Sequence, residues 1–78
     1  MFRVTLTIPG TGRGFSRNFT DPNDAAEYAF TFARGLAAKQ MEPQYFLNKI
    51  TACGTDIDAL ILAMDDLVGI EIYEVEGK

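Results

Sequence analysis

The sequence predicts an α+β domain in which a small antiparallel sheet carries helices on one face. Three patterns predict this class: an alternating strand pattern opens the chain, a long apolar helix pattern follows, and a β-rich segment closes it. We expect the order β-β-α-α-α-β. No linker or repeat interrupts the chain, so residues 1–78 are expected to form a single domain.

The first two segments predict a β-hairpin. Residues 2–8 alternate strictly between apolar and polar side chains, which is typical of a half-buried strand. The glycine-rich stretch 9–14 breaks the pattern, and residues 15–20 are expected to return as the second strand. Arg17 shares a face of that strand with Phe15 and Phe19, so we expect it at the sheet edge or beside a carboxylate.

The longest helix is expected from residue 22 to about residue 41. Asp21 can accept a hydrogen bond from a free amide of the first turn, and Pro22 has the fixed φ that suits a first helical position. The apolar positions spread over more than one face. We therefore expect the sheet to cover the main face. A second helix or a partner protein is expected to cover the flank of Phe30 and Met41.

Residues 43–53 are expected to form the second helix. Their apolar side chains have helical spacing, Pro43 suits a first turn, and Gly54 suits a C-terminal cap. The alternative is a strand over residues 45–52, which would change the order to β-β-α-β-α-β.

The third helix is expected over residues 55–67. Thr55 and Asp58 have the spacing of a capping box, with Asp in place of the usual Glu or Gln. Gly69 then allows the chain to turn into a closing strand over residues 70–76, which are rich in β-branched and aromatic side chains.

Composition disfavours an enzyme. The chain has no histidine, the commonest general base, and its single cysteine, Cys53, excludes an internal disulfide. The aspartate pairs lack the ligand alternation around a glycine that calcium loops show, so no metal or cofactor is expected. No signal peptide precedes the first strand and no apolar run reaches membrane-spanning length, so we expect a cytoplasmic location.

Charge is unevenly distributed along the chain. Residues 1–39 hold five basic and three acidic side chains, a balance of +2, whereas residues 40–78 hold two basic and eight acidic ones, a balance of −6. The acidic second half argues against direct nucleic-acid binding, because phosphates would be repelled. It favours a basic partner, including proteins that themselves bind nucleic acid.

An exposed leucine among carboxylates is the strongest candidate for a binding surface. Leu62 lies on the outer face of the predicted third helix, and Asp65 and Asp66 occupy its last turn, where the helix dipole disfavours anions. We interpret this as an acidic patch with an apolar centre that fits a basic groove. A solvated acidic face with one stray leucine is the alternative. The candidate partner-binding residues are Asp58, Leu62, Asp65, Asp66, Glu71 and Glu74, with Glu76 alongside.

The glycine-rich hairpin is a secondary candidate. Its glycines lead into a strand, whereas a phosphate loop must open a helix, so a flexible tip that presents Arg13 is the better interpretation. With Arg3 and Arg17 nearby, it is suited to grip a carboxylate or phosphate.

The hairpin that runs through Phe19, Thr20, Asp21 and Pro22 into an alanine-rich helix, in an acidic chain of this length, resembles small phage-encoded inhibitors of the anti-CRISPR kind. The resemblance implies binding and blocking without chemistry, with an acidic surface against a nucleic-acid-binding site of a bacterial defence complex. We therefore expect a non-enzymatic inhibitor that binds a larger protein or ribonucleoprotein. The alternatives are a small-ligand, phosphate-binding or oligomer-forming module that acts through the hairpin, and a homodimer formed through Phe30 and Met41.

Overall fold

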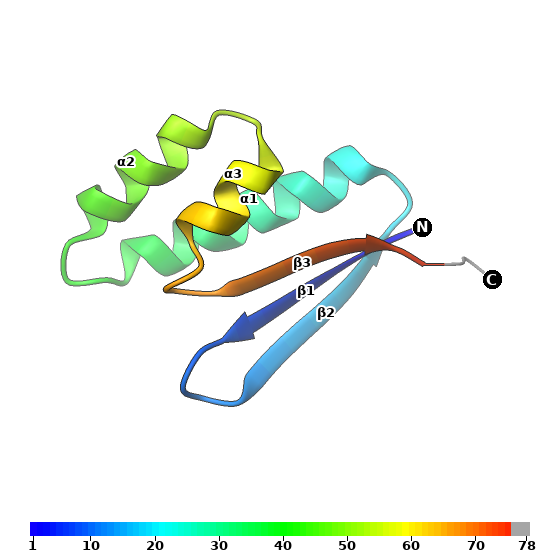
Figure 1. Cartoon of the computed structure of the whole chain (residues 1–78), viewed down its shortest axis with the longest axis horizontal. Coiled ribbons are helices and arrows are strands. Elements are labelled where there is room, and N and C mark those ends of the chain that lie inside the picture. The colour runs from blue at the N-terminus through cyan, green and yellow to red at the C-terminus, as the bar shows by residue number, and fades with distance from the viewer. Residues whose placement is uncertain (76–78) are drawn as a thin grey trace.

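A computed structural model describes residues 1–75 and confirms the predicted order β-β-α-α-α-β (Figure 1). The strand alternative for residues 45–52 is wrong, because this stretch is helical. The elements are β1 (Phe2–Ile8), β2 (Arg13–Phe19), α1 (Pro22–Ala38), α2 (Pro43–Cys53), α3 (Ile57–Ala63) and β3 (Gly69–Glu74).

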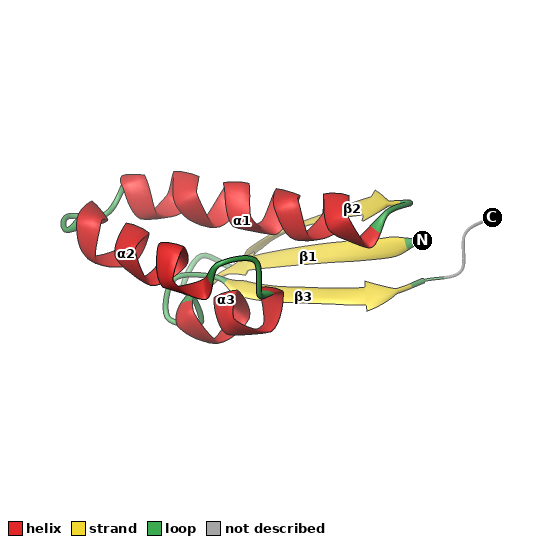
Figure 2. Cartoon of the chain, turned by 90° about the horizontal axis from the view of Figure 1, so that it is seen from above, coloured by secondary structure: helices red, strands yellow, loops and turns green. Residues whose placement is uncertain are grey.

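The sheet has the strand order β2-β1-β3, and both pairings are antiparallel. Val4 and Leu6 of the central strand are fully buried, and the residues paired with them share their face of the sheet. All three helices lie on that side (Figure 2). The opposite face carries Arg3, Thr5 and Thr7 of β1, so the alternation in residues 2–8 separates the core from an open polar face.

Two of the helices cover different parts of the sheet, and the third packs against a helix. α1 runs over β1 and β2, α3 lies beside β3, and α2 packs against α1 (Figure 2). Ala25, Ala29, Ala33 and Ala37 of α1 are fully buried, and their small side chains allow the helix to approach the sheet closely. The buried core consists of Val4, Leu6, Ala25, Ala29, Phe30, Ala33, Ala37, Ile50, Leu60, Met64, Val68 and Ile70.

The start of α1 is confirmed, but its end comes earlier than predicted. Asp21 Oδ1 accepts a hydrogen bond from the Asn23 amide at 2.8 Å, and Pro22 is the first helical residue. The helix ends at residue 38, because the next amides bond back only three residues and the chain must leave the helical conformation before Pro43. The predicted flank is divided: Phe30 is buried and Met41 is fully exposed.

The prediction for α3 is corrected at both ends. Its N-cap is Asp56, not Thr55: Asp56 Oδ1 accepts hydrogen bonds from the amides of Asp58 at 3.0 Å and Ala59 at 3.3 Å. The helix ends at residue 63, four residues early. The amides of residues 67 and 68 both bond to the Met64 carbonyl, which closes a turn toward β3.

The strand boundaries differ slightly from those expected. β2 begins at residue 13 and ends at residue 19, and β3 begins at residue 69 and ends at residue 74. The predicted end of the closing strand, with Glu76, lies outside the described residues.

The two candidate caps of α3 can be distinguished by mutation. We expect Asp56→Ala to lower the free energy of unfolding by about 1 kcal/mol, because two first-turn amides lose their acceptor. Thr55→Ala, the matched control one residue earlier, should have little effect. Urea denaturation measures both, and a larger loss for the threonine variant would contradict the assignment of Asp56 as the cap.

Candidate functional site

The outer side of α3 and the turn after it form an exposed acidic surface with an apolar centre. Leu62 is 80% exposed, although Leu60 and Met64 on either side of it are buried. Asp58 lies one turn before Leu62, and Asp65 and Asp66 follow in the turn after the helix; all three are exposed. We call Asp58, Leu62, Asp65 and Asp66 the α3 acidic face.

The charge of this face is not balanced by cations nearby in the chain. Residues 54–75 contain six carboxylates and no lysine or arginine. Asp56 is one of the six, and its carboxylate caps α3. The sequence predicts Asp65 and Asp66 in the last helical turn, but α3 ends at residue 63, so the chain leaves the helix before the two anions that would oppose its dipole.

The two glutamates of β3 do not both join this surface. Glu71 pairs with Thr5 and therefore lies on the open face of the sheet, away from all three helices. Glu74 pairs with Phe2 on the helix side, at the far end of β3. The expected patch is therefore smaller than the sequence suggested, since sequence spacing alone does not show which side of the sheet a strand residue takes.

The open face of the sheet is a network of polar side chains. Arg3 Nε donates to Asn18 Oδ1 at 2.9 Å, and the hydroxyl oxygens of Thr5 and Ser16 lie 3.2 Å apart. Hydrogen bonding to the Thr5 hydroxyl, and then to Arg3, lowers the pKa of Tyr73 below its ordinary value. These side chains hold one another in place across the three strands.

The three arginines near the hairpin do not lie on the same face of the sheet, so they cannot all bind one anion. Arg3 lies on the open face, whereas Arg13 and Arg17 pair with Ile8 and Val4 on the helix side. Arg17 lies at the sheet edge because β2 is an outer strand, which confirms one of its two expected positions. Its guanidinium carbon lies 5.5 Å from the ring centroids of both Phe19 and Tyr28, which favours a cation–π contact.

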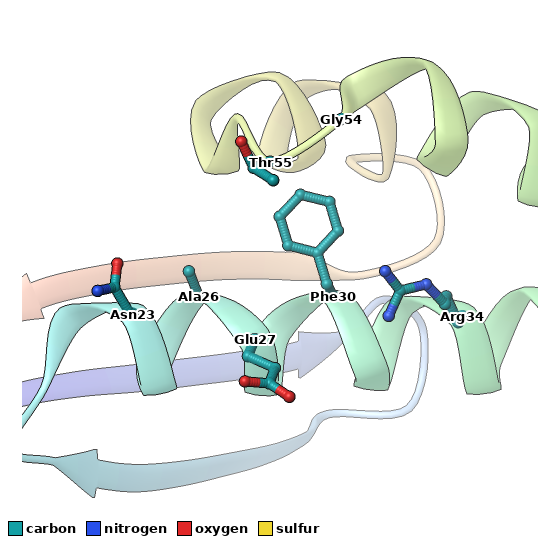
Figure 3. Close-up of a pocket in the computed structure, with 7 residues that line it drawn as sticks. All are labelled: Asn23, Ala26, Glu27, Phe30, Arg34, Gly54 and Thr55. Carbon is teal, nitrogen blue, oxygen red and sulfur yellow. The ribbon is translucent and has the colours of Figure 1, made fainter.

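A hollow of about 300 Å³ lies between α1 and the connection from α2 to α3. The ring of Phe30 points from α1 toward Gly54 and Thr55, and Arg34 lies alongside it, with its guanidinium carbon 5.7 Å from the ring centroid (Figure 3). The Glu27 carboxylate points away from Thr55 (Figure 3). Sequence reasoning missed this hollow because distant segments of the chain form it.

Among residues 1–75, no three acidic or cysteine side chains gather as metal ligands. No helix in the same range has both the length and the apolar character needed to cross a membrane. The Cys53 thiol donates to the Lys49 carbonyl at 3.2 Å, one helical turn earlier.

Together the fold and the surface define a small α+β domain with an acidic helix face. Comparison with protein-family models, with curated proteins and with solved structures gives no match. The function of the chain is therefore inferred from its own geometry.

Proposed function

We propose that this protein is a non-enzymatic interaction module that binds a basic surface of a larger protein or ribonucleoprotein through the α3 acidic face. One observation carries the proposal: Leu62 is 80% exposed among exposed carboxylates, two residues from a fully buried leucine. Burying a leucine side chain on binding is worth roughly 1.5–3 kcal/mol. An apolar centre with a charged rim is the arrangement typical of protein interfaces.

The charge of the face supports a basic partner. Asp58, Asp65 and Asp66 would steer the protein toward lysines and arginines and repel nucleic-acid phosphates. Basic residues gather where proteins bind nucleic acid. The face would therefore compete with nucleic acid for such a site, and the protein would act as an inhibitor, as its resemblance to small phage-encoded inhibitors of bacterial defence complexes also suggests.

Affinity capture from bacterial lysate tests the proposal. The tagged protein is incubated with lysate at low and at high salt, and retained proteins are identified by mass spectrometry. We expect one large, basic partner that is retained at low salt and released at high salt, because exposed charges are screened. Failure to retain a basic partner at low salt would contradict the proposal.

A further inference from the structure

A second surface, at the opposite edge of the sheet from β3, has the properties of a strand-binding site. Within residues 1–75, β2 pairs only with β1, so its other edge presents backbone groups without a strand partner in this range. Every residue of β2 except Phe19 is exposed, and the Phe15 ring is 49% exposed. An open edge beside an exposed aromatic side chain can accept an additional strand.

The side chains along this edge alternate in a way that defines a complementary sequence. Arg13, Phe15 and Arg17 pair with Ile8, Leu6 and Val4, so all three lie on the helix side of the sheet. Every second side chain of an added strand would therefore lie on the helix side of the sheet. Three such side chains in a row would face a cation, an aromatic ring and a second cation.

The aromatic side chain of this edge, Phe15, lies beside a hollow. Phe15 contacts Phe32 of α1, with ring centroids 6.4 Å apart. A hollow of about 320 Å³ lies beside them, between β2 and α1, and Lys39 adds a third cation at its rim. This hollow is large enough for an aliphatic side chain. It is lined by Ile8, Phe15, Phe32, Gly35, Leu36 and Lys39.

We propose that the β2 edge binds an extended acidic segment of a partner protein as a fourth strand. The segment carries a carboxylate, an apolar residue and a second carboxylate at alternate positions, facing Arg17, the Phe15–Phe32 hollow and Arg13. The two arginines that attract the segment lie within β2, whereas Asp21 and Asp24 follow its Phe19 end.

Charge favours such a segment over a second copy of this chain. A two-fold pairing of β2 with itself would bring four arginines to one edge, and these strands contain no carboxylate. The β3 strand of another copy is acidic, but Glu71 and Glu74 lie on opposite faces of it. Only one of them could face the arginines.

Titration with a defined peptide tests the proposal. The probe is a synthetic peptide in which glutamate, leucine and glutamate alternate with threonine, added to isotope-labelled protein and followed by NMR. We expect shifts concentrated in β2 and around Phe32 and Lys39. Arg13→Glu with Arg17→Glu should weaken binding about tenfold or more. Arg34→Glu with Lys49→Glu, which makes the same change in net charge elsewhere, should leave the affinity unchanged.

Backbone methylation of the peptide tests strand addition itself. Amides of alternate residues in a strand point to opposite edges, so only one set can bond to β2. The two methylation patterns should therefore differ in their effect on binding. Methylation of one set, either the threonine amides or the glutamate and leucine amides, should abolish binding, and methylation of the other set should not affect it. Equal effects, equal binding of a lysine-for-glutamate peptide, absence of shifts in β2, or a concentration-dependent mass that shows self-association would each overturn the proposal.

Discussion

Replacing Asp58, Asp65 and Asp66 with lysine is expected to abolish retention of the partner that the wild-type protein captures from bacterial lysate. The three exposed side chains surround Leu62, so reversal of their charge would place cations against a basic surface. Like charges facing one another across an interface are strongly unfavourable, and the affinity should fall about a hundredfold or more. Parallel captures with wild-type and variant protein measure this loss.

The same variant should remain folded. The carboxylate that caps α3 belongs to Asp56, which is not changed. Lysine in the first turn of α3 opposes the helix dipole, but lysines just after its last turn favour it, so the two effects offset each other. Circular dichroism and thermal unfolding check that the fold is retained.

A matched control separates the position of the charges from their number. Asp24, Glu27 and Glu42 are exposed carboxylates outside the α3 acidic face, and Asp24 occupies the first turn of α1 as Asp58 does that of α3. Changing these three to lysine alters net charge equally but should reduce retention far less. If both triple variants lose the partner equally, or neither does, the α3 acidic face is not the binding surface.

The fold could be predicted because local patterns and tertiary packing agree along most of this chain. The alternation in residues 2–8 matches a central strand with one buried face, and Asp21 and Pro22 begin α1 where predicted. The boundaries of α2 also match, because Gly54 adopts a φ of +63° that favours glycine after a helix.

The details that failed depend on competition between neighbours or on tertiary placement. Thr55 and Asp56 are both good caps, and local spacing does not decide between them. The sequence predicts Glu71 in the acidic patch, but strand pairing places it on the other side of the sheet. The hollow beside Phe15 also escaped prediction, because its walls come from β1, β2 and α1, whose packing the sequence does not specify.

Leu60 and Leu62 should give opposite results when each is changed to alanine. Leu60 is fully buried, so Leu60→Ala should lower the free energy of unfolding by about 2–5 kcal/mol, through lost burial and the cavity left behind. That is a large part of the roughly 5–15 kcal/mol that stabilises a typical domain. Urea denaturation should show an earlier midpoint, and thermal unfolding should show a lower Tm.

Leu62→Ala, two residues later on the same helix, is the matched counterpart. Because the side chain is 80% exposed, its removal should change the free energy of unfolding by less than about 0.5 kcal/mol. Partner retention should nevertheless fall about tenfold or more, since the apolar centre of the interface is lost. Unchanged retention would mean that only the carboxylates of the α3 acidic face, and not Leu62, contribute to binding. A large loss of stability would instead mean that Leu62 packs within the domain, and the argument for an interface at α3 would fail.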